Sequence, residues 1–175
     1  MQTLGLPFTV MTSEVDETTQ PGMSPEAVVE ELALRKAQAV ASRLDAGVVL
    51  GSDTIVVLDG RILGKPADEP DAFRMLSELQ GREHTVYSGV ALTDAATGRF
   101  EVAHSNTTVR IRPLTEREIR SYIATKEPMD KAGSYAIQGI GSTLVESIEG
   151  DYFTVVGLPL CLTARMLSRF GITLL

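Results

Sequence analysis

The stretch VVLGSDTIVVLDGRILGKP, residues 48–66, constrains the fold of this chain more than any other part of it. Two apolar runs predict strands, and Gly51–Ser52–Asp53 interrupts them. Asp59–Gly60 predicts a tight hairpin turn, because both residues tolerate a positive φ. The pattern therefore places the Asp53 carboxylate where two strands meet and the Lys65 ammonium just after the returning strand. Such a hairpin would let both side chains face one cavity, as a metal ion and a phosphate chain require.

The composition indicates one soluble globular domain over residues 1–175, since 43% of the residues are hydrophobic and 22% are charged. The net charge of −7 argues against a general nucleic-acid surface. It does not exclude a small anionic substrate, because a few lysines and a divalent cation can form a local positive pocket.

The single cysteine, Cys161, excludes an internal disulfide and a zinc site built from several cysteines. A reduced, cytoplasmic setting is the default expectation for such a chain. No apolar run reaches membrane-spanning length, and the first residues, MQTLGLPFTV, do not resemble a signal peptide.

Hydrophobic periodicity and capping signals predict alternating helices and strands. Helices are expected from Pro25 to about Leu44, from Asp68 or Glu69 to Gly81, from Thr115 onward, and from Pro159 to Gly171. Strands are expected at Phe8–Met11, Val48–Leu50, Thr54–Leu58, Arg61–Leu63, His84–Leu92, Phe100–Ile111, Leu144–Ile148 and Tyr152–Val156. Leu4–Pro7 is typical of a helix end, while residues 13–22 and 126–142 read as loops. At least three strand pairs look like direct hairpins, so we predict an α/β fold with a mixed, twisted sheet flanked by helices.

Several polar residues have both a chemical and a purely structural interpretation. Asp53 lies between apolar runs, where a carboxylate needs a partner, but it can also cap a strand end or form an Asx-turn. Lys65 alone reads as an exposed loop lysine, Glu17 as a solvated charge, and Lys36 as part of a solvated helix face. Gln138 either holds its loop together or contacts a ligand.

Other chemistries lack their sequence signals. No P-loop, dinucleotide fingerprint or nucleophile elbow is present. His84 and His104 have no metal-ligand spacing with each other or with Cys161, so both are interpreted as structural.

Short motifs along nearly the whole chain resemble the Maf family of nucleoside triphosphate pyrophosphatases, once described as septum-formation inhibitors. In family order, these motifs are Leu4–Phe8, Val15–Glu17, Ala33–Ala37, Gly51–Thr54, Leu63–Pro66, His84–Val90, Asp130–Gly139 and Val156–Pro159.

The resemblance implies a fold like that of inosine triphosphate pyrophosphatases, often as a homodimer. It also implies hydrolysis of a nucleoside triphosphate to the monophosphate and diphosphate with a divalent metal, Mg²⁺ or Mn²⁺. Asp53 falls on the family's proton acceptor, and Glu17, with Asp53, falls on positions suited to metal binding. Lys36 and Lys65 fall on basic positions that would neutralise the phosphate chain.

Substrate choice in the resembling family is linked to the positions of Thr54 and Gln138. The stretch Tyr135–Gly139 looks like the branch that acts on dTTP and UTP, whereas the branch that acts on 7-methyl-GTP carries Glu in place of that Gln. An amide can donate and accept hydrogen bonds at a pyrimidine edge. Two alternatives remain: a pyrophosphatase for a modified nucleotide, and a nucleotide-binding regulator of cell division without turnover.

The sequence departs from the family pattern at its start. Family members usually open with a strand and a Ser-x-Ser-Pro-Arg-Arg segment before the Leu-Gly-Leu-Pro turn, and here the chain begins at that turn. Arginines of that segment would grip phosphate in a bidentate way. We therefore read the single domain as truncated at its N-terminus, and expect lower stability and activity than in a version extended upstream.

Overall fold

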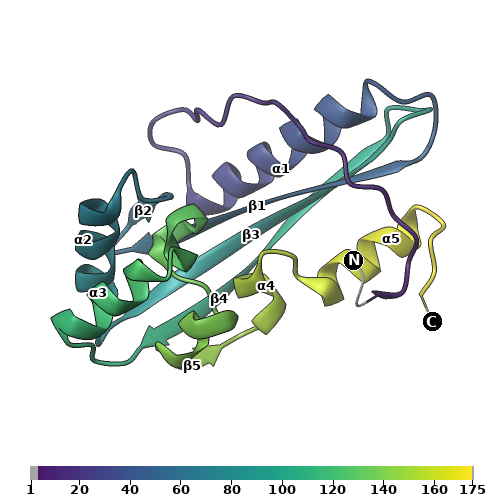
Figure 1. The fold of residues 1–175 in the computed structure, drawn as a ribbon. Coiled ribbons are helices and arrows are strands. Elements are labelled where there is room, and N and C mark those ends of the chain that lie inside the picture. Colours follow the sequence, from purple (N-terminus) through teal and green to yellow (C-terminus); the bar gives the residue numbers. More distant parts are fainter. Residues whose placement is uncertain (1–3, 175) are drawn as a thin grey trace. The chain divides into compact units, whose positions relative to one another are not determined.

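A computed structural model describes residues 4–174 of the chain. The helices are α1 (Pro25–Ala41), α2 (Glu69–Leu79), α3 (Glu116–Ala124), α4 (Tyr152–Val156) and α5 (Leu160–Arg169). The strands are β1 (Val48–Leu58), β2 (Arg61–Leu63), β3 (Glu83–Asp94), β4 (Phe100–Ile111) and β5 (Val145–Glu149). Three short 3-10 helices, η2 (Glu127–Asp130), η3 (Ala132–Ser134) and η4 (Gly139–Thr143), lie between α3 and β5 (Figure 1).

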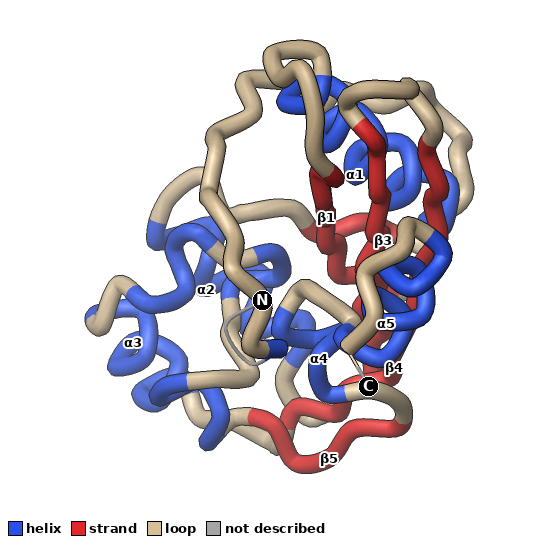
Figure 2. The backbone as a smooth tube through the Cα atoms, turned by 90° about the vertical axis from the view of Figure 1, so that its right-hand side faces the viewer, coloured by secondary structure: helices blue, strands red, loops and turns tan. Residues whose placement is uncertain are grey.

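The strands form one sheet in the order β2-β1-β3-β4-β5. β2 pairs antiparallel with β1, and β5 pairs antiparallel with β4. β3 and β4 follow one another as a hairpin, whose turn carries a bond from Gly98 N to Asp94 O of 2.9 Å (Figure 2). The predicted α/β fold class, a sheet flanked by helices, is confirmed. The sheet was expected to be mixed and is instead antiparallel, because the short turns after β1 and β3 can join only antiparallel strands and β5 also runs antiparallel to β4.

The described chain divides into two compact units, and the long strands β1, β3 and β4 contribute residues to both. The first unit holds residues 4–53, 88–105 and 157–174, and the second holds residues 54–87 and 106–156. The single domain expected over residues 1–175 stays a prediction.

In the first unit, two helices pack on opposite faces of the strands because side chains alternate along a strand. Ala33 and Ala37 of α1 pack with Val49 on one face. Met166 and Leu167 of α5 pack on the other face, in a cluster that includes Val48, Leu50, Val90 and Leu92. α1 begins where the sequence predicts, since Ser24 Oγ accepts a hydrogen bond from Ala27 N at 3.3 Å and Pro25 occupies the first helical position.

In the second unit, α2 and α3 lie side by side and cover a core formed with the ends of the strands (Figures 1 and 2). Leu76 and Leu79 of α2 pack there with Ile119 and Ile123 of α3. Asp68 caps α2, and Thr115 and Glu118 form the predicted capping box of α3. Both helix starts therefore follow directly from local sequence.

The same core contains one titratable pair, His84 and Tyr135. The Nε2 atom of His84 lies 2.7 Å from the Tyr135 hydroxyl, and the two rings meet edge to face. The other ring nitrogen, Nδ1, has no hydrogen-bond partner within residues 4–174. Burial lowers the pKa of His84 to about 4 and raises the pKa of Tyr135. His84 is therefore structural, as predicted, and stays neutral in the folded protein down to an acidic pH.

This burial makes the stability of the protein dependent on pH. Below pH 6.5 the unfolded chain binds a proton at His84 that the folded chain does not bind until about pH 4. The free energy of unfolding should therefore fall by about 3 kcal/mol as the pH drops through that window. Urea unfolding between pH 7 and pH 4 measures this slope, and His84→Gln, which does not titrate, should remove that contribution. His104→Gln, at a half-exposed histidine, should keep it; an unchanged slope in His84→Gln would contradict the assignment.

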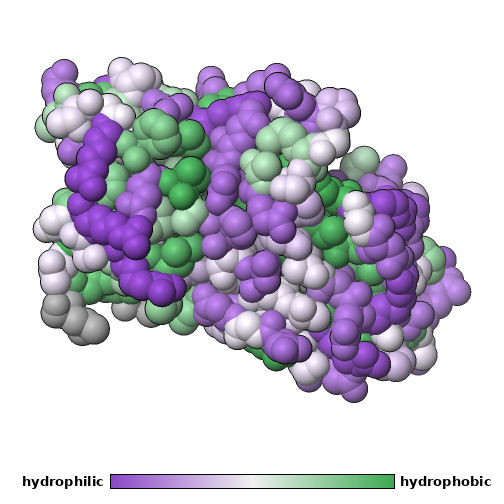
Figure 3. Space-filling model, turned by 180° about the vertical axis from the view of Figure 1, so that it is seen from behind, coloured by the Kyte–Doolittle hydropathy of each residue, from purple (hydrophilic) through white to green (hydrophobic). Residues whose placement is uncertain are grey.

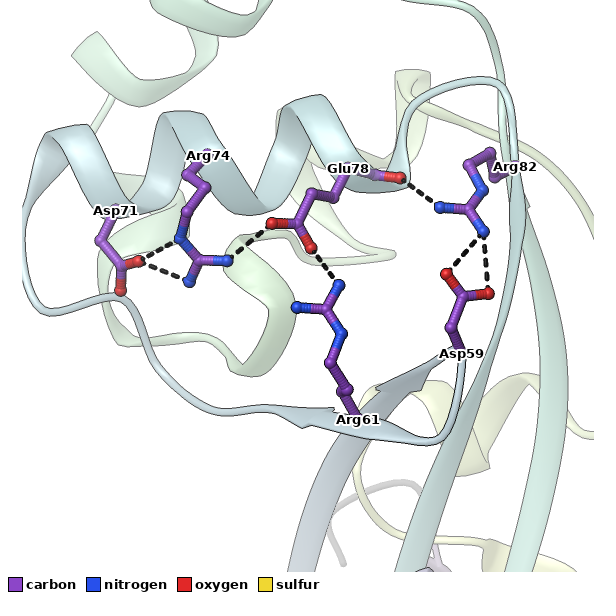
Figure 4. Close-up of polar contacts among 6 residues, drawn as sticks. All are labelled: Asp59, Arg61, Asp71, Arg74, Glu78 and Arg82. Atoms are coloured by element: carbon purple, nitrogen blue, oxygen red, sulfur yellow. Dashed lines mark hydrogen bonds and ion pairs between the residues drawn. The ribbon is translucent and has the colours of Figure 1, made fainter.

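A chain of surface ion pairs fastens the β1–β2 turn to α2 (Figure 4). Arg82 reaches both carboxylate oxygens of Asp59 at 2.8 Å, and Arg61 reaches Glu78 at 2.7 Å. Arg74 continues the chain, contacting Glu78 at 2.8 Å and Asp71 at 2.6 Å. Single exposed pairs contribute little, but shared partners of this kind hold one another in place.

Four predictions of secondary structure are wrong, and the first two concern strands. Phe8–Met11 forms no strand: Phe8, Val10 and Met11 are 45%, 81% and 41% exposed, and residues 6–20 form neither helix nor strand. Tyr152–Val156 is helix α4, because the Asp151 carboxylate accepts bonds from Phe153 N and Thr154 Oγ1 and so caps a helix. The first helix ends at Ala41, before the predicted Leu44.

A fourth prediction, that Gly51–Ser52–Asp53 interrupts the strand, is also wrong. β1 runs unbroken from Val48 to Leu58, and Asp53 lies within it. Asp59 and Gly60 make the predicted turn with φ angles of 51° and 74°. The β1–β2 ladder extends from Leu58–Arg61 only to Val56–Leu63, so it includes neither Asp53 nor Lys65.

The face of the molecule drawn in Figure 3 shows several separate hydrophobic patches between polar side chains. No helix within residues 4–174 is both long enough and apolar enough to cross a membrane.

Candidate active site

Asp53 belongs to a row of β1 residues that faces α1 in the first unit. Val49 packs with Ala33 and Ala37 of α1, and Gly51 and Asp53 follow it at the strand period of two. The strand pattern thus directs the Asp53 carboxylate toward the helix that carries Lys36.

Two glycines let α1 lie directly on the strands. A Cβ atom added to Gly51 would lie 2.4 Å from Ala33 O, and one added to Gly89 would lie 2.2 Å from Val29 O. Any larger residue would overlap the helix backbone at both points. Gly51, which the sequence pattern suggests as a break, is therefore a contact glycine inside a strand.

The short distance between helix and strand brings three predicted site residues together. The Lys36 ammonium lies 2.5 Å from Asp53 Oδ1 and 2.8 Å from Glu17 Oε1. The Asp53 side chain is 11% exposed and the Lys36 side chain 22%, so the pair is largely screened from water. Glu17, at 56% exposure, is the most exposed member of this cluster.

Arg35 of α1 holds the loop that carries Glu17. Its Nη1 atom donates to the carbonyl oxygens of Asp16 at 3.0 Å and Thr18 at 2.8 Å, on either side of Glu17. Hydrogen bonds from Thr18 lower the pKa of the Asp16 carboxyl. Arg35 and Lys36 are neighbours on one helix. Arg35 therefore holds the backbone of this loop, and Lys36 holds the Glu17 side chain.

The electrostatics of the cluster keep Lys36 charged. Burial acts to lower the pKa of Lys36, but hydrogen bonds to Asp53 and Glu17 and their negative charges outweigh it, so the pKa is raised. An ammonium with two carboxylate partners favours the ionised form of both. Within the described residues, no group of three or more His, Cys, Asp and Glu side chains is placed to hold a metal.

Ser52 points to the opposite face of β1 and has a structural role. Its hydroxyl lies 2.7 Å from Gly89 O and 2.8 Å from Gly157 O, so these two carbonyls share its single hydrogen. This agrees with the absence of a nucleophile elbow in the sequence.

The other predicted site residues, Thr54, Lys65 and Gln138, belong to the second unit. Lys65 is exposed, and the carbonyl of Gly64 before it accepts a 3.0 Å bond from Gly133 N. Gln138 is exposed and lies four residues beyond the turn at Ser134. The predicted common cavity of Asp53 and Lys65 stays a prediction.

Two further residues of the second unit, Tyr122 and Glu127, hold the segment around Gln138 and have no distinguishing sequence signal. The Glu127 carboxylate accepts bonds from Tyr122 and from the backbone of Ile140 and Gly141. The only available hint was the glycine-rich composition of residues 126–142, which does not identify the acceptor.

Comparison with known proteins identifies the family of this chain. The family described as "Maf-like protein" matches residues 1–170. A dTTP/UTP pyrophosphatase of Pelotomaculum thermopropionicum is 53% identical over 175 residues, covering 100% of this chain and 92% of the relative. Proteins of the same name from Moorella thermoacetica (53% identity; 97% of this chain, 87% of the relative) and Symbiobacterium thermophilum (52%; 98% and 87%) are also similar. These matches confirm the resemblance that the motifs indicate, and the chain belongs to the Maf-like protein family.

Proposed function

We propose that this chain hydrolyses nucleoside triphosphates, with dTTP and UTP preferred, to the monophosphate and diphosphate. The observation that carries the proposal is the screened cluster in which Lys36 contacts Asp53 at 2.5 Å and Glu17 at 2.8 Å. The names of the relatives, dTTP/UTP pyrophosphatase, support the substrate class.

Asp53 is the proposed general base. Its carboxylate takes a proton from a water molecule as the oxygen attacks the α-phosphorus, and the bond from that phosphorus to the bridging oxygen breaks to release diphosphate. Lys36 keeps the carboxylate ionised and orients it through the direct contact. A fixed, ionised base beside the reacting centre is what this attack requires.

The substrate-binding residues we propose are Lys36, Thr54, Lys65 and Gln138. The lysines neutralise negative charge on the phosphate chain, which increases as the diphosphate leaves. Gln138 can pair its amide with the edge of a pyrimidine base, and Thr54 contributes a hydroxyl to substrate choice.

A divalent cation, Mg²⁺ or Mn²⁺, is the cofactor we propose, held by Glu17 and Asp53. Both side chains offer carboxylate oxygens, and both already converge on one cationic atom, Lys36 Nζ. Mg²⁺ is commonly held by one or two carboxylates together with substrate phosphates, so this donor set fits. When bound, such a cation supplies positive charge to the phosphate oxygens.

The proposed activity is tested by diphosphate release from a panel of triphosphates with Mg²⁺ or Mn²⁺. We expect turnover of dTTP and UTP with kcat/KM at least about tenfold above purine triphosphates, because the base-reading residue is an amide. Preferred turnover of a modified nucleotide would assign a different substrate. Tight nucleotide binding without product under either metal would indicate a non-catalytic regulator and overturn the proposal.

A further inference from the structure

The segment that carries Gln138 is fastened on both sides of that residue. On one side, the Tyr122 hydroxyl accepts a bond from Ala136 N at 3.1 Å. On the other side, the two carboxylate oxygens of Glu127 accept bonds from Ile140 N at 3.1 Å and Gly141 N at 2.8 Å. The anchors thus lie two residues before Gln138 and two and three residues after it.

Tyr122 and Glu127 act as one unit, because the Tyr122 hydroxyl donates to Glu127 Oε1 at 2.9 Å. The Tyr122 hydroxyl therefore donates one hydrogen bond to the Glu127 carboxylate and accepts another from the loop backbone. Burial alone would raise the pKa of the Glu127 carboxyl, but bonds from Gly141, Tyr122 and Ile140 lower it. A carboxylate with several neutral donors is held firmly in its charged form.

The loop fits closely around the Glu127 carboxylate. A Cβ atom on Gly139 would lie 2.5 Å from Glu127 Oε2, and Gly139 has a φ of +64° that favours glycine. A Cβ atom on Gly141 would lie 2.3 Å from Ala136 O and 3.0 Å from Glu127 Oε1. The backbone around Gln138 can therefore approach the carboxylate only because glycine occupies both positions.

Side chains before Gln138 are fixed in the core, whereas Gln138 itself is exposed. Tyr135 is 5% exposed and contacts His84, and Ile137 is 8% exposed. The arrangement presents one amide to solvent from a backbone that is immobilised on both sides. A side chain that contacts a ligand needs a support that fixes its direction, and this backbone provides one for Gln138.

We propose that Glu127, with Tyr122, is a positioning residue that sets the direction of Gln138 and thereby the choice of nucleobase. The inference rests on the proposed function, in which Gln138 reads the base. Glu127 touches neither substrate nor reacting atoms; it acts through the backbone of Ile140 and Gly141. Its loss should therefore alter selectivity between substrates and the KM for pyrimidine triphosphates more than kcat.

A double-mutant cycle separates this role from a general contribution to folding. Glu127→Gln keeps the size of the side chain but replaces one acceptor oxygen with a donor, so it cannot accept both backbone bonds. We expect Glu127→Gln to reduce the ratio of kcat/KM for UTP over GTP by about tenfold, mainly through KM. In a Gln138→Ala background the same substitution should change that ratio less than about twofold, because there is no amide left to direct.

Glu116→Gln provides a matched control, since Glu116 forms an exposed helix pair with Arg120 in the same unit. Glu116→Gln should leave the ratio of kcat/KM for UTP over GTP unchanged. Hydrogen exchange gives an independent readout, in which the amides of Ile140 and Gly141 should exchange faster in Glu127→Gln and not in the control. If Glu127→Gln does not fold, Tyr122→Phe, which removes only the hydroxyl, takes its place in the double-mutant cycle.

Equal losses of selectivity with and without Gln138 would overturn the inference and leave the proposed activity intact. If the wild type binds nucleotides without turnover, the proposed activity fails, and the cycle is measured with dissociation constants for UTP and GTP from calorimetry. The inference then stands if the effect on the affinity ratio disappears in Gln138→Ala, and falls if it persists. A wild type that binds neither nucleotide overturns both.

Discussion

Asp53→Asn should reduce kcat/KM for dTTP and UTP by about 10³-fold while the protein remains folded. General base catalysis contributes about 10²–10⁴-fold, and an amide of the same shape cannot take the proton from water. The substitution also removes one of the two carboxylates that contact Lys36, leaving Glu17 at 2.8 Å. Steady-state diphosphate release measures the loss, with circular dichroism as the check on folding.

Asp45→Asn is the matched control, because Asp45 is an exposed carboxylate in the bend before β1. It should retain wild-type turnover. If Asp53→Asn keeps more than about a tenth of the activity, the loss is too small for a general base, and Asp53 does not have that role.

The largest effect on stability is expected from Gly89→Ala in β3. The new methyl group would lie 2.2 Å from Val29 O and 2.4 Å from Val29 C, both backbone atoms of α1, so no side-chain rotation can relieve the overlap. The helix must move away from the strand by roughly 1 Å, which disrupts close packing along the interface. We expect a loss of about 3 kcal/mol or more in the free energy of unfolding, and a melting temperature lower by about 6–12 °C.

Gly64→Ala tests whether the effect is specific to this contact. Gly64 has no positive φ, and a Cβ atom there would meet no atom within 4 Å, so its stability should change little. Denaturant unfolding of the two variants gives the comparison. Similar losses in both would show that glycine flexibility, and not the contact with α1, dominates at Gly89.

Local signals in the sequence predicted the elements whose ends are set by nearby residues. The helix starts at Pro25 and Glu116 follow from the preceding cap residues, Ser24 and Thr115, each of which binds the amide three residues further on. The turn at Asp59–Gly60 follows from two adjacent backbone conformations. Errors arose in two segments whose strand-forming residues outweighed the other signals. Phe8–Met11 is exposed and belongs to no strand of the described residues 4–174, and the neighbouring Asp151 side chain caps a helix at Tyr152–Val156.

The candidate site was less accessible to sequence reasoning, because its parts are far apart along the chain. Glu17, Lys36 and Asp53 come from a loop, a helix and a strand; Glu17 and Lys36 alone read as ordinary charges, and Asp53 alone has both a chemical and a structural interpretation. Family motifs nominated all three, but only the approach of α1 to β1 explains why they meet. Glu127 was not nominated at all, because its partners are backbone amides, which every residue except proline has.

The glycine contacts beneath α1 also bear on how this protein tolerates sequence drift. Because backbone atoms of α1 lie so close to Gly51 and Gly89, a side chain at either position would force a wider spacing between helix and strand. The same spacing sets the separation of Lys36 and Asp53, so replacement of either glycine should be selected against. Two positions without side chains thus limit which sequences preserve the geometry of the charged cluster.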